Sequence, residues 1–572
     1  MEGPSVRLRT PGLIVLLLAI LAAACAAPGT GVGSQSGAQQ AGAPSSPTKR
    51  ITAAVLADPP FVYARLNPPS TTGGTESMVH VGLTRFDRFG VRGPALAKEA
   101  PSVENGLWRV FPDGKMQLTW NLRPDAQWHD GMPFTSADVV FTANVVRDRD
   151  VPQLRDRRYD MIESVEAPDP HTVVVNWRQT YIEADALFTY DLGLPIAKHI
   201  VEGVYAENKA GLFEHAYWST EFVGAGPYRL KEYVPSSHAL LEANDRYVLG
   251  RPKVDVIEVK FIPESNTMIA NLLSGTVDVG IGRNISLDQA LQMRDNWRAG
   301  RMEIGYKSWH VIYPQLLNPT PAVVTDVQFR RALLQAIDRE QMAETLIAGL
   351  SSVAHNYLNP QEPEHNEVMA SVTQYAHDPR RSMQMIESLG YRLGADGGFR
   401  DADGQQLSVQ LWANAQLDVP PKAALAIADY WQRAGVKTET SMMAPQMLAD
   451  LERVTTFPSF TVSQNPDDKA YLQNFHSSNL PLPSNNFTGQ NKPRYSNAEF
   501  DRLLDRFYVT ISRGERTEVL RQIVAHISDQ LPLMGLFYNV EPTMVNNRVL
   551  NVYARTQETD QGRNVHEWDV TR

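Results

Sequence analysis

The chain of 572 residues contains a single cysteine, Cys25, so no disulfide can form within it. A fold of this length must therefore be stabilised by buried apolar surface, hydrogen bonds and ion pairs alone. The sequence supplies the apolar residues, since 43% of the chain is hydrophobic and 9% is aromatic. A chain this long exceeds the size at which a single core keeps growing. We expect the chain to divide into at least two lobes.

Cys25 stands at the end of an uncharged apolar run, residues 13–24, that follows the cations Arg7 and Arg9. The run is too short to cross a hydrocarbon layer of about 30 Å and is typical of a cleaved secretory signal. The four residues before the cysteine, Leu-Ala-Ala-Ala, resemble the bacterial lipobox, in which the thiol carries diacylglycerol. We predict a signal peptide over residues 1–24 and lipid attachment at Cys25. An unmodified buried thiol is the alternative.

The stretch after the cysteine consists of Ala, Gly, Ser, Gln, Pro and Thr, with no charge before Lys49. Such a composition offers too little apolar surface to offset the entropy of ordering. Residues 25–50 are therefore predicted to be a lipidated cysteine and its flexible tether. The protein is expected outside the cytoplasm, anchored to the cell membrane and facing the periplasm or the cell surface.

The formal charge is −10 at pH 7, and the charges of both signs are interspersed. Surfaces that bind phosphate backbones need clustered Lys and Arg, so nucleic acid is excluded as a partner. Beyond the signal, no apolar run is long enough to cross a membrane.

Beyond the tether, short strand patterns alternate with well-capped helices, which predicts the α/β class. Asp326 caps one helix, and Asp378 before Pro379 opens another. Thr135 and Asp138 form a capping box for a third. The residues expected on the buried face of this third helix are Ala137, Val140, Phe141 and Val145.

The segment from Leu122 to Phe141 reads as a strand, an Asp130–Gly131 turn and the capped helix. It closely resembles the signature segment of the family 5 extracellular solute-binding proteins, the peptide and nickel class. Further matches follow in the order of the family, at 82–87, 94–97, 224–228, 244–247, 273–278, 329–339 and 495–501. The resemblance covers residues 51–572.

This resemblance implies a two-lobed periplasmic-binding-protein type II fold, with an extra subdomain inserted in the first lobe. The implied divisions are lobe I over 51–90, 199–304 and 546–572, the insertion over 91–198, hinge strands at 305–318 and 532–545, and lobe II over 319–531. Both crossing segments are apolar and rich in β-formers, which is consistent with paired hinge strands. Composition alone leaves plain core strands open as the alternative.

The resemblance also implies the function. A solute held between two lobes touches both only when they close, so it shifts the population toward the closed state. The closed protein would deliver an oligopeptide-like or other bulky polar solute to the permease and ATPase subunits of an ABC transporter. A monomer without any cofactor is expected.

Peptide-binding members carry a Trp-x-Ala-Asp-Tyr-x-Asp-Pro stretch whose carboxylate pairs with the α-ammonium of the peptide. The corresponding stretch here, residues 460–468, is shortened, and the carboxylate position falls at Gln464 or is missing. An amide suits a neutral hydroxyl-rich or amide ligand better than an ammonium. An oligosaccharide or other non-peptide solute therefore stays open beside an oligopeptide.

Other candidates for ligand contact follow from positions that face the cleft in the family. Trp309 and His310 lie on the first crossing strand, and Trp412 ends a strand that leaves the Asp403–Gly404 turn. Aromatic faces there would stack on a sugar ring or an apolar side chain. The polar candidates are Gln464, Asn465, Arg283 and Asn284. Packed aromatic residues and surface polar groups are the alternative interpretation.

A secreted lipoprotein hydrolase is the alternative from another functional class. The sequence has no Gly-x-Ser-x-Gly elbow, and no two histidines are spaced three to five residues apart as in a zinc helix. We expect no enzymatic activity and no metal. The acidic residues Glu362 and Glu364, with His365 and His355 near them, are expected on an exposed, proline-rich loop as solvated charges. A sensing or structural role without transport is a third interpretation.

Overall fold

The computed structural model describes residues 48–56, 58–67, 74–88, 90–190, 192–282, 285–554 and 560–571. The predicted signal, Cys25 and most of the tether lie outside the described residues, as do Arg283 and Asn284. Within these ranges, no helix combines the length and the apolar character that crossing a membrane requires.

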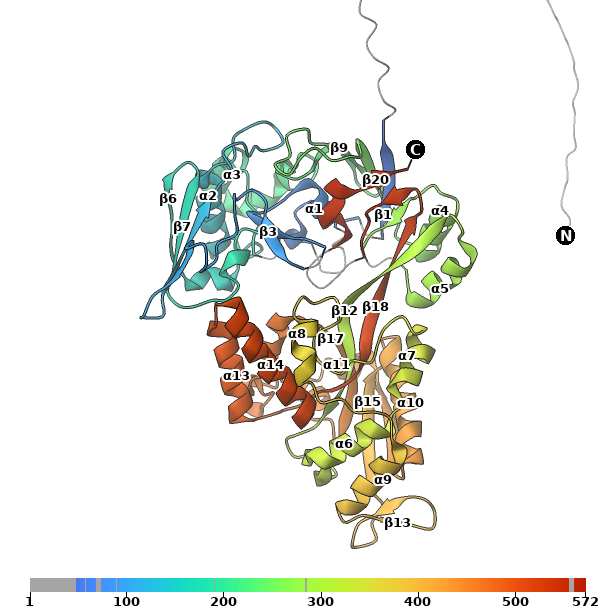
Figure 1. Ribbon diagram of the computed structural model, residues 1–572. Helices are drawn as coiled ribbons and strands as arrows, with labels where there is room; N and C mark the ends of the chain where they lie inside the picture. The colour runs from blue at the N-terminus through green and yellow to red at the C-terminus, as the bar shows by residue number, and fades with distance from the viewer. Residues whose placement is uncertain are drawn as a thin grey trace, which may run out of the picture. The chain divides into compact units, whose positions relative to one another are not determined.

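A ten-stranded mixed sheet forms the centre of the described chain (Figure 1). In spatial order its strands are β16 (Lys437–Met443), β15 (Ser408–Asn414), β17 (Phe460–Asn465), β12 (Gly300–Pro314), β18 (Met534–Asn546), β11 (Val279–Gly280), β1 (Arg50–Val55), β10 (Val256–Phe261), β9 (His238–Ala243) and β8 (Tyr228–Val234). Strand β15 is parallel to both of its neighbours, and so is β1; the other pairs are antiparallel.

The long strands β12 and β18 join the two ends of this sheet. They pair antiparallel along almost their whole length, and from Trp309 to Pro314 the other edge of β12 pairs with β17. The register shifts between Tyr306 and Ser308, and again between His310 and Val311. Such irregularities bend and twist a strand pair. The prediction that the two crossing segments pair as strands is confirmed, whereas their action as a hinge stays a prediction.

The buried apolar residues form cores on either side of these two strands. Two clusters draw their buried members from residues 51–297 and 544–568. Two others draw theirs from residues 309–540. The partly buried Ile182 and Ile511 each pack against a cluster of the opposite group. The chain therefore builds a first core from residues 51–297 and 544–568 and a second core from residues 309–540, and the two touch at a few side chains.

The segment predicted as an insertion holds an antiparallel sheet of its own. Its strands are β4 (Trp108–Val110), β5 (Met116–Asn121), β7 (Thr172–Trp177) and β6 (Ile162–Asp169), in that spatial order. Helix α2 (Ser136–Arg147) packs on β6 and β7 (Figure 1). The remaining two-stranded pairs are β2 (Thr84–Phe86) with β3 (Arg92–Pro94), β13 (Arg392–Leu393) with β14 (Phe399–Arg400), and β19 (Val549–Leu550) with β20 (Asp569–Val570).

The other helices pack against the strands and against one another, and they contribute to both cores. They are α1 (Thr75–Val79), α3 (Lys198–Glu207), α4 (Ser265–Leu273), α5 (Leu287–Asn296), α6 (Val327–Ala336), α7 (Arg339–Ile347), α8 (His365–Val368), α9 (Pro379–Ser388), α10 (Val419–Arg433), α11 (Pro445–Leu448), α12 (Leu451–Thr455), α13 (Ala498–Val509) and α14 (Arg513–Gln530).

The predicted helix starts are confirmed. The Asp326 and Asp378 side chains accept backbone hydrogen bonds at the first turns of α6 and α9, and the Thr135–Asp138 capping box opens α2. Phe141 and Val145 of α2 are buried as expected, but Val140 is only half-buried, and the expectation for Ala137 is wrong because that residue is exposed. The helix turns Val139, Ala143 and Val146 into the core, so Ala137 points to solvent although its neighbours Ser136 and Asp138 are buried.

Candidate ligand-binding cleft

A cavity of about 750 Å³ lies between the inserted segment and the second core. Residues 158–183 form one wall, and residues 470–509 form the other. This volume falls in the range of pockets that enclose small ligands. The lining residues that carry polar or aromatic groups are Arg158, Gln179, Thr180, Tyr181, Glu183, Gln473, His476, Ser478, Asn479, Asp505 and Tyr508.

The wall of the second core is held by hydrogen bonds close to the cavity. The 3-10 helix η8 (Lys469–Phe475) is capped by Asp468, which accepts from the backbone N–H of Tyr471. The Tyr508 hydroxyl donates to the Lys469 carbonyl at 2.7 Å and accepts from the Gln473 N–H at 2.8 Å. These bonds join η8 to α13 and fix the Tyr508 side chain at the cavity.

Charged groups fix the opposite wall. Asp156 caps the 3-10 helix η2 (Arg157–Met161), and its carboxylate lies 2.7 Å from Arg158 and 3.0 Å from Arg65. Burial alone would raise the pKa of Asp156, but the hydrogen bonds and charge of Arg158 outweigh it and lower the pKa to about 2. The Tyr181 hydroxyl donates to Glu183 at 2.8 Å. The cavity therefore presents charges of both signs beside two tyrosine rings.

The residues predicted to contact a ligand lie deeper in the fold, on the neighbouring strands β15, β17 and β12. Trp309 stands opposite Asn465, and His310 opposite Gln464. Trp412 stands opposite Thr461. Only 8% of Trp412 is exposed and 2% or less of Trp309, His310 and Asn465.

These residues do not share one face of the sheet. Successive residues of a strand point to opposite faces, so Trp309 and Asn465 face one side, whereas His310 and Gln464 face the other. Trp309 and Trp412 belong to one core cluster. His310 hydrogen-bonds the Asn539 side chain, and Gln464 donates to the Ser308 hydroxyl. None of the five lines the 750 Å³ cavity, and their role in binding stays a prediction.

An acidic cluster lies at the start of η8. It consists of Glu362, Glu364, Asp467 and Lys469. The Lys469 ammonium is 2.9 Å from both Glu362 and Glu364. The expectation that these two glutamates are solvated on an exposed loop is wrong, since Glu362 is 7% exposed. Lys469, which is far from them in the sequence, pairs with both glutamates, so this loop packs against the core.

Asp467, the last member of the acidic cluster, is completely buried. One carboxylate oxygen accepts from the Asn359 amide at 2.9 Å, and the other has no partner in the described part of the chain. Burial, reinforced by the charge of Glu362, raises the pKa of Asp467 to about 7. The acidic cluster and the cavity walls were not predicted from the sequence, because their residues come from segments far apart in the chain.

Comparison with known proteins places this architecture. The model of the middle region of bacterial extracellular solute-binding proteins, family 5, matches residues 94–480. The oligopeptide-binding protein AppA of Bacillus subtilis is 23% identical over 534 residues, which cover 92% of each chain.

Solved structures show the same fold. AppA of Bacillus subtilis in complex with a nonapeptide superposes with a TM-score of 0.61, at 20% identity, over 92% of this chain and all of that one. The ABC transporter substrate-binding protein CtaP of Listeria monocytogenes superposes with a TM-score of 0.70, at 19% identity, over the same shares. The fold is thus the α/β type II periplasmic-binding-protein fold. The chain belongs to the bacterial extracellular solute-binding proteins of family 5.

Proposed function

We propose that this protein is the extracytoplasmic solute-binding component of an ABC importer and captures an oligopeptide-like solute by closing its two lobes. The observation that carries this proposal is the 750 Å³ cavity, whose walls belong to elements on either side of β12 and β18. A solute in this cavity contacts both walls at once, so its binding energy favours the closed arrangement. No covalent bond is made or broken.

The divisions expected from the sequence are part of the proposal. Lobe I would comprise 51–90, 199–304 and 546–572 with the inserted segment 91–198, and lobe II would comprise 319–531. The separation of the buried clusters supports this arrangement. Lipid attachment at Cys25 would hold the protein at the membrane beside its permease, as a monomer.

Among the deeper predicted residues, Trp309 and Asn465 share one face of the sheet and are proposed to contact the solute when the lobes rearrange around it. The indole N–H of Trp309 and the amide nitrogen of Asn465 are buried donors with no acceptor in the described part of the chain. A buried donor without an acceptor costs free energy, so an acceptor supplied by a ligand would stabilise it. The amide at Gln464 favours an oligosaccharide or other non-peptide solute as the second candidate.

The test is a thermal-shift screen against peptide, sugar and metal-chelate libraries. A ligand present at about a hundred times its dissociation constant should stabilise the folded protein by about 2.7 kcal/mol. Stabilisation by peptides supports the first candidate, and stabilisation by sugars alone supports the second. Turnover of an ester or peptide substrate without any stabilising solute would overturn the proposal.

A further inference from the structure

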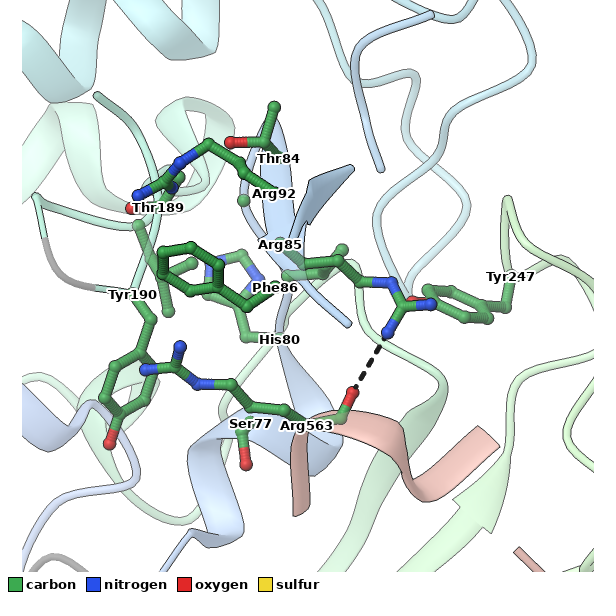
Figure 2. A pocket seen from close by; sticks show the side chains of 13 residues that line it. Ser77, His80, Thr84, Arg85, Phe86, Arg92, Thr189, Tyr190, Tyr247 and Arg563 are labelled. Atoms are coloured by element: carbon green, nitrogen blue, oxygen red, sulfur yellow. Dashed lines mark hydrogen bonds between the residues drawn. The ribbon is translucent and has the colours of Figure 1, made fainter. Parts of the chain in front are cut away.

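A second, smaller cavity of about 30 Å³ lies within the first core and is lined by three arginines, Arg85, Arg92 and Arg563 (Figure 2). We call it the arginine pocket. Arg85 and Arg92 come from the β2–β3 hairpin, and Arg563 comes from the 3-10 helix η11 (Gln561–Glu567). The hairpin and η11 are separated by most of the chain, so the pocket exists only in the folded protein.

Aromatic rings fix two of the guanidinium groups. The Arg92 guanidinium lies over the Phe86 ring, 4.1 Å from its centroid, and that of Arg563 lies over the Tyr190 ring at 4.5 Å (Figure 2). Arg85 donates to the Arg563 carbonyl at 3.5 Å. Stacking holds a planar guanidinium in one orientation, so little side-chain entropy remains to be lost when a ligand binds.

Two of the three guanidinium groups of the arginine pocket lie near a carboxylate. Arg92 pairs with Asp185 at 3.4 Å, and Arg563 lies 3.8 Å from Asp560. Arg85 has no carboxylate within 4 Å among the described residues. One Nη atom of Arg92 is buried and has no acceptor anywhere in the described ranges. A buried charged donor without an acceptor costs free energy, and an acceptor supplied by a ligand would remove this cost.

The size of the hollow selects the kind of acceptor. A buried water needs about 10–15 Å³ of such space, so 30 Å³ accommodates about two oxygen-sized atoms. Two oxygens in one plane are what a carboxylate offers to a guanidinium fork. Asp185, the partner of Arg92, follows closely after Tyr181 and Glu183, which line the 750 Å³ cavity. The segment that supplies the partner of Arg92 therefore also contributes to the cleft wall.

We propose that the arginine pocket binds a carboxylate group of the captured solute, with Arg92 as its principal contact. The proposal rests on the proposed function and narrows it to solutes that carry a carboxylate. The amide at Gln464 is compatible with this proposal. The arginine pocket would recognise a carboxylate of the solute, and no carboxylate at position 464 would be needed to bind an ammonium group.

The experiment measures acetate binding to the purified protein by saturation-transfer NMR, in acetate and chloride buffers of equal ionic strength. The wild type should bind acetate saturably, and Arg92→Gln should weaken binding about tenfold, because a charge-assisted pair is lost. Arg92→Lys, which keeps the charge and loses the fork, should fall between them. The matched control is Arg109→Gln, which removes the same charge from an exposed site on β4.

Several outcomes would overturn the proposal. These are the absence of saturable acetate binding, an unchanged affinity in Arg92→Gln, an equal loss in Arg109→Gln, and tighter binding of inorganic phosphate than of acetate. Circular dichroism establishes that Arg92→Gln is folded, and Arg85→Gln replaces it if it is not. Failure here, with a stabilising solute still found in the thermal-shift screen, would remove the carboxylate site and leave the solute-binding function intact.

Discussion

The arginine pocket of the first core and the acidic cluster of the second treat buried charge in opposite ways. In the acidic cluster, Lys469 sits between Glu362 and Glu364, and protonation near pH 7 relieves the charge of Asp467. In the arginine pocket, Arg92 pairs with Asp185, yet one of its buried Nη atoms has no acceptor among the described residues, and a hollow remains beside it. Removing one partner from an enclosed charge pair is costly, whereas a charge that faces a hollow is available to a ligand.

The largest expected effect concerns acid, through the buried histidines of the first core. Burial lowers the pKa of His80 to about 4 and that of His129 to about 3. Both values lie below the ordinary 6.5, so their contribution to stability is complete above about pH 6.5 and is lost as the pH falls. At about pH 4.5 the two together should cost on the order of 5 kcal/mol of unfolding free energy.

Urea unfolding at about pH 7.5 and about pH 4.5, together with NMR titration of the imidazoles, checks this loss. Imidazole signals that titrate near the ordinary value would show that His80 and His129 are exposed to water, contrary to the structure.

The second effect tests the pairing within the acidic cluster. Burial would lower the pKa of Lys469, but its two glutamate partners outweigh this and raise it. Lys469→Met leaves Glu362 and Glu364 buried without a partner and should cost about 3–5 kcal/mol of unfolding free energy. The control Lys422→Met removes an exposed ion pair with Asp418 and should cost at most about 1 kcal/mol. Equal losses in urea denaturation would mean that the acidic cluster is solvated.

The third prediction concerns Asp467, whose contribution to stability depends on pH in the opposite sense to that of His80 and His129. The pKa of Asp467 in the folded protein, about 7, lies above its unfolded value of 3.8. Its contribution is therefore complete below about pH 4 and is lost as the pH rises through 7. Asp467→Asn should stabilise the protein by about 2–4 kcal/mol at about pH 8 and by much less at about pH 4. The exposed Asp113→Asn serves as the control, and a pH-independent difference for Asp467→Asn would contradict the assignment.

The smallest expected effect tests the role of Asp185 in the arginine pocket. Asp185 pairs with Arg92 and competes with any added carboxylate for its guanidinium. Asp185→Asn should therefore tighten acetate binding by about threefold. The NMR titration used for Arg92→Gln measures this change. Weaker binding in Asp185→Asn would show that Asp185 orients Arg92 and does not compete.

Local features of this fold were readable from the sequence, and long-range contacts were not. The caps at Asp326 and Asp378 and the capping box at Thr135 depend on residues within one turn, so their pattern sufficed. The pairing of Lys469 with Glu362 joins residues 107 positions apart, and nothing local marks it. The arginine pocket likewise needs Arg563 beside a hairpin from the start of the fold.

The sequence itself shows that two of the residues predicted to contact the solute cannot act together. Trp309 and His310 are consecutive residues of a strand, so their side chains must point to opposite faces of the sheet. The structure places them in this way, with Trp309 beside Tyr357 and His310 beside Phe537. A single bound solute therefore cannot contact both side chains in this arrangement.

The central claim, closure of two lobes around a solute, is tested most directly by the distance between spin labels on opposite sides of the cavity. Exposed sites at Gln153 and Arg506, changed to cysteine in a Cys25→Ser background, suit double electron–electron resonance. Addition of a solute that stabilises the protein in the thermal-shift screen should shorten and narrow the distance distribution. A distribution that stays unchanged while the solute is bound would contradict the account.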